Sequence, residues 1–321
     1  MRISVIYHNF CIFVVIKQLD MNLFSFSAHF GTEDDCINHF KSERDKIGLT
    51  CKCGSTEHFW IKSRLSYECK KCRSRTSLKS GTIMENSNLS FLIWYKTMFL
   101  MSVTKKGFSA KEIQKQLGLK RYEPVWAMVH KIRKAMGNRD AQYTLEGMIE
   151  FDEAYFTVES SEIEQKKGIR GKGSVGKQNV AMIAESTPLE DIDTGKKEKH
   201  VRFFKAKVLD GHSGEEINEA IKESIDNQSI VFTDKSTSYV DISDFVELHI
   251  MEKSSKETTE ETLKWIHIAI SNAKRNLLGN YHKIKRKYLQ LYLNEFIYKL
   301  NRRYFGDRLF ERLIIANITG L

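Results

Sequence analysis

Hydrophobic and polar residues follow two different periods along this chain of 321 residues. In the first half, Thr32 and the acidic residues that follow it predict a short helix over 32–48, and the apolar spacing of residues 88–138 predicts further helices. Between them, residues 49–82 alternate aromatic and polar side chains over short stretches, which predicts hairpins. The period changes at 147–157, GMIEFDEAYFT, where an alternating pattern predicts the first strand of a second region.

The second half of the chain continues with strands and helices in a mixed order. A polar loop rich in Gly and Lys spans residues 158–177. The elements expected after it are strands near 178–185 and 200–209, a helix near 214–226, strands near 229–234 and 246–251, and helices near 258–277 and 285–303. This order predicts a mixed α/β sheet with flanking helices.

Residues 1–20 carry an apolar run that is too short to span a bilayer and that no small-residue cleavage site follows. Met21 is a second plausible start, so we expect residues 1–20 to be a dispensable strand or the product of an upstream start codon. We therefore predict a cytoplasmic protein with no membrane partner. The length predicts about two domains with hydrophobic cores large enough to fold without disulfides.

Charge is unevenly distributed along the chain. The formal net charge is +10, and 41% hydrophobic residues argue against disorder. Residues 100–140 carry a net charge of +7 and residues 271–303 one of +8, so the remainder is acidic. Two basic blocks indicate two surfaces that each face a phosphate backbone.

Four of the six cysteines form two close pairs, which predicts a zinc site made by Cys51, Cys53, Cys69 and Cys72. The second pair is a normal CxxC, whereas the first is a CxC, one residue shorter than usual. The 15 residues between the pairs suit a structural zinc ribbon. Four free thiols are the alternative, and Cys36 or His58 could replace Cys51 as a ligand.

A helix-turn-helix is expected within the first basic block. Ser109 and Glu112 form a capping box that begins one helix, and Gly118 can make the turn. Pro124 opens the second helix, PVWAMVHKIRKAM, whose apolar face leaves three cations for DNA. These cations are Lys131, Arg133 and Lys134. An ordinary amphipathic helix pair with a solvated basic face is the alternative.

Two aspartates lie in apolar strands, where an unpaired carboxylate is costly. Asp152 stands within IEFDEAY, and Asp234 ends SIVFTD. Carboxylates on neighbouring strands of one sheet can hold divalent cations that activate water or a 3′-hydroxyl for phosphodiester chemistry. A surface residue at a strand end and a helix N-cap are the respective alternatives.

The helix EETLKWIHIAISNAKRNLLG is expected to supply a third ligand. His267 and Lys274 are seven positions apart and share one face, which places a ligand beside a cation that can bind phosphate. Glu260, seven residues before His267, is a second candidate ligand. A packing role is the alternative for His267.

Taken in order, these motifs resemble the bacterial DDE-type insertion-sequence transposases of the ISXO-like group, which carry an N-terminal zinc ribbon. The resemblance spans roughly residues 21–315. Its segments are YECKKCRSRTSLKSGT at 67–82, TKKGFSAKEIQKQLG at 104–118, VWAMVHKIRKAMG at 125–137, IEFDEAYF at 149–156, FTDKSTSY at 232–239, WIHIAISNAKRNLLGNYHKI at 265–284 and YLNEFIYKLNRR at 292–303.

The resemblance implies an RNase H-like catalytic domain, a mixed sheet with flanking helices, preceded by a zinc ribbon and a helix-turn-helix. It implies that Asp152 and Asp234 are the first two metal ligands. Relatives with a full triad have a glutamate seven residues before a lysine; Lys274 matches that lysine, and His267 stands at the glutamate's position. The triad is therefore interpreted as Asp-Asp-His, and imidazole suits manganese or zinc better than magnesium.

The resemblance also implies the reaction and the partners. The protein is expected to bind terminal inverted repeats in double-stranded DNA, to cleave 3′ ends and to join them to target DNA. Mg²⁺ or Mn²⁺ would serve catalysis and Zn²⁺ the ribbon, in a homodimer or larger assembly on DNA in the bacterial nucleoid. One alternative is an inactive or domesticated zinc-ribbon DNA-binding protein. Another is a zinc-ribbon regulator whose α/β half binds a small molecule.

Further DNA contacts are expected outside the helix-turn-helix. The loop at 158–177 could lie along DNA or be a disordered charged loop. The residues proposed for these contacts are Arg170, Lys172, Arg275, Arg302 and Arg303. The resulting organisation is an extension at 1–20, an N-terminal helix at 21–48, a zinc ribbon at 49–85, a helix-turn-helix region at 86–140 and a catalytic domain at 145–310.

Overall fold

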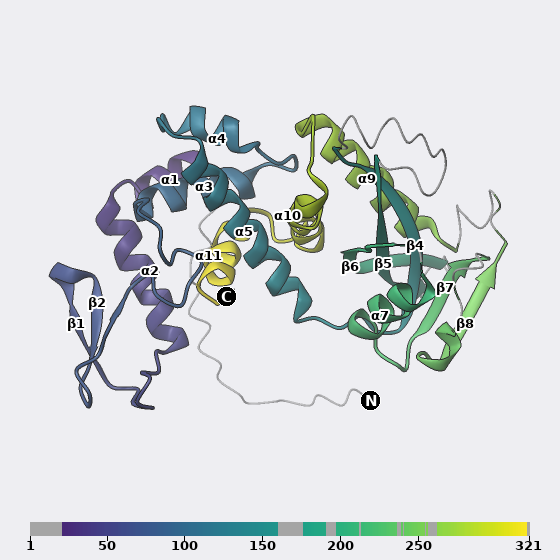
Figure 1. Ribbon diagram of the computed structural model, residues 1–321, viewed down its shortest axis with the longest axis horizontal. Helices are drawn as coiled ribbons and strands as arrows, with labels where there is room; N and C mark the ends of the chain where they lie inside the picture. The colour runs from purple at the N-terminus through teal and green to yellow at the C-terminus, as the bar shows by residue number, and fades with distance from the viewer. Residues whose placement is uncertain are drawn as a thin grey trace, which may run out of the picture.

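The computed structural model describes residues 21–159, 176–190, 197–211, 213–235, 239, 241–253, 255 and 262–319. Helices and a small sheet from the first half of the chain lie on one side of the molecule (Figure 1). A larger sheet with its own helices lies on the other side (Figure 1). The expected extension at 1–20 and most of the loop expected at 158–177 lie outside the described residues.

Capping side chains define where the N-terminal helices begin. The Thr32 hydroxyl accepts from the backbone N–H of Asp35, whose carboxylate accepts from the N–H of Thr32. Ser109 and Glu112 form the same reciprocal box, as predicted. Such bonds satisfy first-turn N–H groups that have no partner within the helix. The helices are α1 (Leu23–His29), α2 (Glu33–Ile47), α3 (Phe91–Val103), α4 (Ala110–Gln116) and α5 (Glu123–Ala141).

A small antiparallel sheet lies between α2 and α3 in the sequence. Its strands are β1 (His58–Ile61), β2 (Ser66–Cys69) and β3 (Arg75–Ser77), in the order β1-β2-β3. The hairpins predicted from the alternating pattern are therefore confirmed.

The second region is built on a five-stranded mixed sheet of order β6-β5-β4-β7-β8. The strands β4 (Met148–Thr157), β5 (Lys177–Glu190) and β6 (Lys197–Val208) are antiparallel neighbours. On the other side of β4, β7 (Ile230–Asp234) and β8 (Leu248–Glu252) run parallel to it. The predicted mixed α/β sheet is confirmed, and its order fits an RNase H-like domain.

Helices cover both faces of this sheet. The helix α7 (Gly214–Ser224) packs on the face that carries Ile149 and Phe151. The helices α9 (Lys264–Asn280) and α10 (Leu289–Asn301) pack on the face that carries Ala154 and Phe156. Because side chains alternate along a strand, even-numbered residues of β4 point towards α9. That face includes Asp152.

The C-terminal helix α11 (Leu309–Thr319) returns to the first region. Its Phe310 and Leu313 are buried in the core formed by the N-terminal helices. Figure 1 shows this helix beside α5, on the side away from the large sheet. Residue 310, where the predicted catalytic domain ends, therefore already lies in the core of the other region.

Two arginines that were expected to contact DNA hold α5 to α10 instead. Arg133 is 1% exposed; its Nε donates to Glu295 at 2.8 Å, and its Nη2 donates to the Tyr281 hydroxyl at 2.8 Å. Arg302 is 7% exposed and donates to Asp140 at 2.6 Å. The prediction of DNA contacts is wrong for Arg133 and Arg302, because both guanidinium groups are buried in ion pairs.

Candidate active site

Parallel strands bring Asp152 and Asp234 to the same level of the sheet. In the register of β4 and β7, Glu150 is the partner of Phe232. Two residues further along each strand stand Asp152 and Asp234. Adjacent strands lie about 4.8 Å apart, so the two aspartates are neighbours across the strand pair.

The ionised form of the Asp152 carboxyl group is electrostatically unfavourable in this position. Burial and the charge of Asp234 raise the pKa of Asp152 to about 7. The backbone N–H of Glu153 donates to Oδ1 of Asp152 at 2.8 Å, and this hydrogen bond acts to lower the pKa of Asp152. A bound cation would remove this unfavourable interaction by pairing with both carboxylates.

Asp234 also offers an acceptor to a cation. Its Oδ1 is buried and receives no hydrogen bond from the part of the chain that the structure describes. Buried acceptors normally have a partner, so this atom fits a metal ligand. Among the described residues, only the four cysteines bring three or more ligand atoms within 4.8 Å of one another, so the carboxylate site is more open.

The helix α9 places His267 beside the carboxylates. Its Nδ1 lies 3.7 Å from Oδ2 of Asp152, and the His267 side chain is 38% exposed. Burial lowers the pKa of His267 from its usual 6.5, whereas Asp234 acts to raise it. The imidazole is thus neutral at pH 7 and has a lone pair for a metal. The structure therefore brings Asp152, Asp234 and His267 together.

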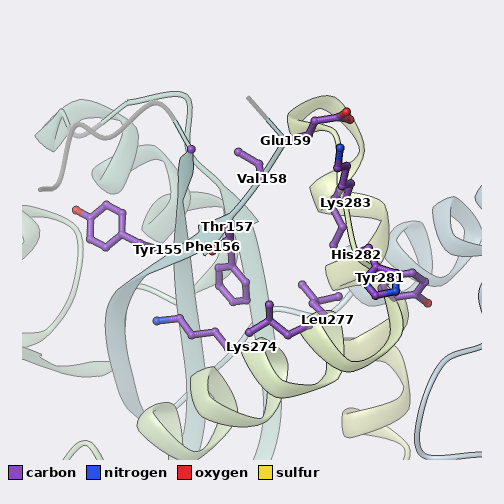
Figure 2. Close-up of a pocket in the computed structure, with 13 residues that line it drawn as sticks. Tyr155, Phe156, Thr157, Val158, Glu159, Lys274, Leu277, Tyr281, His282 and Lys283 are labelled. Atoms are coloured by element: carbon purple, nitrogen blue, oxygen red, sulfur yellow. The ribbon is translucent and has the colours of Figure 1, made fainter. Parts of the chain in front are cut away.

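Lys274 lies two turns further along α9. Its charge acts to lower the pKa of Asp152, and its Nζ is 5.9 Å from the ring centroid of Phe156. A cleft of about 390 Å³ lies between the end of β4 and the segment that follows α9. Figure 2 shows Lys274 at one end of this cleft and Lys283 with Glu159 at the other.

Residues 144–301 match the family model of the ISXO2-like transposase domain. The chain carries an ISXO2-like transposase domain. The predicted resemblance is therefore confirmed for this region. The matched range contains all four predicted catalytic residues, Asp152, Asp234, His267 and Lys274. No curated protein matches the chain.

One buried carboxylate of the ISXO2-like domain was not predicted. Glu150 is 0% exposed and accepts from the backbone N–H groups of Trp265 and Ile266 at 2.8 and 2.9 Å. Its position two residues before Asp152 places both side chains on the same face of β4. A charged residue on the buried face of an apolar strand was the signal that could have indicated it.

Three of the predicted site residues lie outside the described residues. Glu260, the alternative third ligand, lies outside the described residues. The predicted DNA-contacting residues Arg170 and Lys172 also lie outside them.

Four cysteine sulfurs converge at the base of the small sheet. All four Sγ atoms lie within 4.8 Å of one another, with 3.5 Å between Cys51 and Cys72 and 3.6 Å between Cys53 and Cys69. Thiolates bound tetrahedrally at about 2.3 Å from zinc are about 3.8 Å apart, so this spacing fits zinc. A backbone N–H of Cys72 contributes most to lowering the pKa of Cys69 to about 6, which favours the thiolate.

The shortened CxC pair reaches the cluster through a tight turn. Gly54 follows it with a φ of 82°, a conformation that glycine adopts without strain. Cys36 is buried in the core of the N-terminal helices, and the His58 Nδ1–H donates to the Thr56 carbonyl at 3.0 Å. Neither belongs to the cluster, so neither replaces Cys51.

The remaining predicted DNA-contacting cations differ in exposure. Lys134 and Arg275 are exposed. Lys131 is partly exposed and donates to the Glu85 carbonyl at 2.7 Å, and Arg303 donates to the Val201 carbonyl at 2.7 Å. None of the described helices combines the length and the apolar character needed to cross a membrane.

Proposed function

We propose that this chain is an insertion-sequence transposase that cleaves the 3′ ends of its element and joins them to target DNA. The observation that carries the proposal is the convergence of Asp152, Asp234 and His267 on one face of an RNase H-like sheet. The ISXO2-like domain over residues 144–301 supports DNA as the substrate. A regulator that binds a small molecule would require no such convergence of metal-binding groups.

The side chains of this site have distinct roles in the proposed reaction. Asp152 and Asp234 supply the negative charge that holds divalent cations, and His267 supplies a neutral nitrogen ligand. When held by these residues, Mg²⁺ or Mn²⁺ would supply the positive charge that activates a water or 3′-hydroxyl and stabilises the leaving oxygen. A nitrogen ligand suits Mn²⁺ better than Mg²⁺. Lys274 presents a cation to the phosphate oxygens of the substrate.

A second cleft supports a path for DNA across the molecule. It has a volume of about 810 Å³ and lies between the N-terminal helices and α9, α10 and α11. Its described lining includes Lys105, Lys106 and Arg275 and contains no carboxylate. A groove lined by one sign of charge favours a phosphate backbone.

The N-terminal region would recognise the ends of the element. We assign the cysteine cluster to structural zinc, and α4 with α5 to a helix-turn-helix that binds terminal inverted repeats. The exposed Lys134 is the α5 cation that we retain for DNA contact. Because two ends must be held together for strand transfer, we expect a dimer or a larger assembly on double-stranded DNA.

Cleavage of a plasmid that carries the flanking ends of the element tests the proposal. With Mg²⁺ or Mn²⁺, the wild type should produce 3′-hydroxyl ends, and Asp152→Ala or Asp234→Ala should abolish them because the cations lose a charged ligand. Activity should be higher with Mn²⁺ than with Mg²⁺.

The control is Asp244→Ala, which removes an exposed carboxylate from the same domain and should leave cleavage unchanged. Absence of cleavage by the wild type and by Asp152→Ala alike would contradict the proposed enzyme. That result would favour an inactive or domesticated DNA-binding protein.

A further inference from the structure

The buried Glu150 makes an unusual contact with the helix that carries His267. A single oxygen, Oε2, accepts from the backbone N–H groups of Trp265 and Ile266 at 2.8 and 2.9 Å. These are the second and third residues of α9, which begins at Lys264. N–H groups at these positions are the ones that an N-cap side chain normally satisfies.

Within the part of the chain that the structure describes, the helix α9 has no side-chain cap of its own. Its N-cap residue is Leu263, which offers no side-chain hydrogen bond, and its first turn contains no acidic residue. The nearby Thr262 hydroxyl donates to Glu252 instead. Glu150 therefore supplies from β4 both the acceptor and the negative charge that the start of a helix favours.

This contact connects the helix that carries His267 to β4, the strand that carries Asp152. Asp152 stands two residues after Glu150 on the same face of β4, about 6.7 Å further along. His267 is the residue immediately after Ile266. The position of Glu150 thus sets the start of α9, and with it the separation of 3.7 Å between His267 and Asp152.

We infer that Glu150 is a positioning residue that holds His267 at the distance from Asp152 that metal binding requires. The inference rests on the proposed function, because it assigns a purpose to the contact only if His267 is a ligand. Glu150 acts through α9 and has no contact with the substrate in this scheme.

The chain offers a matched control for this contact. Glu33 on α2 accepts from the first two residues of α3, with Phe91 at 2.8 Å and Leu92 at 2.7 Å. It is the same kind of carboxylate contact with the start of a helix. It lies among the N-terminal helices, so its loss should affect folding stability but not the carboxylate site.

Mn²⁺ affinity of the full-length, zinc-loaded protein, measured by electron paramagnetic resonance of free Mn²⁺, tests the inference. Glu150→Ala should weaken binding by about 10–100-fold, as loss of a group that orients a ligand typically does. Glu150→Gln should restore most of the affinity, because its amide oxygen accepts the same two N–H groups. Glu150→Asp keeps the charge but is one methylene shorter, so it should bind Mn²⁺ more weakly than Glu150→Gln.

A double-mutant cycle shows whether Glu150 acts through His267. In a His267→Ala background, Glu150→Ala should weaken Mn²⁺ binding by no more than about threefold, because the ligand that it positions is absent. Glu33→Ala should lower the urea midpoint and leave Mn²⁺ affinity within about twofold of the wild type. If Glu150→Ala does not fold, the relative Mn²⁺ affinities of Glu150→Gln and Glu150→Asp test the positioning role, which predicts tighter binding by Glu150→Gln.

Each alternative outcome has a separate meaning. Glu150→Ala could lower Mn²⁺ affinity by the same factor with and without His267, or Glu150→Gln could bind Mn²⁺ more weakly than Glu150→Asp. Either result would overturn the positioning role alone. Mn²⁺ binding that is indifferent to Asp152→Ala would overturn the proposed function and the positioning role with it.

Discussion

The cysteine cluster and the carboxylate site are assembled in opposite ways. The four cysteines lie within 22 consecutive residues, and two turns of a small hairpin sheet bring their sulfurs within 4.8 Å of one another. Asp152 and His267 are 115 positions apart and meet only because α9 packs on the face of β4 that carries Asp152. A local site depends on its own turns, whereas a distributed site depends on the packing of the whole domain.

Removal of zinc should have the largest effect and should reveal this difference most directly. Structural zinc contributes an apparent binding free energy of about 10–16 kcal/mol in small zinc domains. We therefore expect a strong chelator to abolish amide-exchange protection in β1, β2 and β3 while β4 and β5 keep theirs. Hydrogen exchange measured by mass spectrometry checks this expectation.

The control for chelation is Cys36→Ala, which removes a buried thiol outside the cluster. It should keep one zinc per chain and normal protection in the small sheet. Loss of protection in β4 and β5 at the same chelator concentration would show that the two regions unfold together and that the ribbon is not an independent site.

The same contrast explains which features the sequence predicted. The paired cysteines, the helix start at Thr32, the capping box at Ser109 and the alternation at 147–157 each depend on residues close in the chain. Local spacing therefore predicted the small sheet, the helix starts and β4. The sequence around Asp152 and Asp234 was also enough to identify them as candidate ligands, because a carboxylate in an apolar strand is a rare pattern.

Features that depend on packing between distant elements were predicted less well. Net charge indicates composition but not which way each cation points. Arg133 lies one helical turn after Val129, so it falls at the margin of the buried face, whereas Lys134 falls outside it. Its partner Glu295 is 162 positions away, and only the packing of α10 on α5 brings the two together.

The helix α11 illustrates the same limit. Nothing in the spacing of its apolar residues indicates whether it packs on the large sheet or on the N-terminal helices. The core that it joins includes Trp94 and Met98 of α3. Glu150 was missed for a related reason, since its partners are backbone groups of a helix more than 100 positions away.

Breaking the Arg133 ion pair should have the second largest effect. In Arg133→Ala the carboxylate of Glu295 loses its buried partner, although Lys299 remains 3.1 Å away. Removal of one member of a buried pair typically costs about 3–5 kcal/mol. Urea unfolding should show this loss, and Lys134→Ala, a change on the exposed side of the same helix, should alter stability by less than about 0.5 kcal/mol.

The Arg133→Ala variant also tests whether the cysteine cluster is independent of packing between distant helices. Its zinc content should be unchanged, because the cysteine cluster is held by its own turns. Similar losses of stability in Arg133→Ala and Lys134→Ala would contradict the assigned ion pair, and so would an effect of Arg133→Ala on zinc stoichiometry.

The pH dependence of stability should be the smallest effect, and it belongs to the carboxylate site alone. The pKa of Asp152 is raised from 3.8 to about 7 in the folded protein. Between these values the folded state keeps a proton that the unfolded state has lost, so stability falls as the pH rises. From pH 5 to 7.5, without added Mg²⁺ or Mn²⁺, we expect Asp152 to account for a loss of about 2 kcal/mol.

Urea unfolding of the wild type, Asp152→Asn and the exposed control Asp244→Asn at both pH values measures this contribution. Asp152→Asn should remove it, because the amide does not titrate, whereas Asp244→Asn should keep the wild-type pH dependence. Saturating Mn²⁺ should reverse the sign in the wild type, since the cation binds the ionised carboxylate and stabilises the folded state. An identical pH dependence in the wild type and Asp152→Asn would mean that burial and the neighbouring Asp234 do not raise the pKa of Asp152, and the carboxylate site would lose its electrostatic basis for binding a cation.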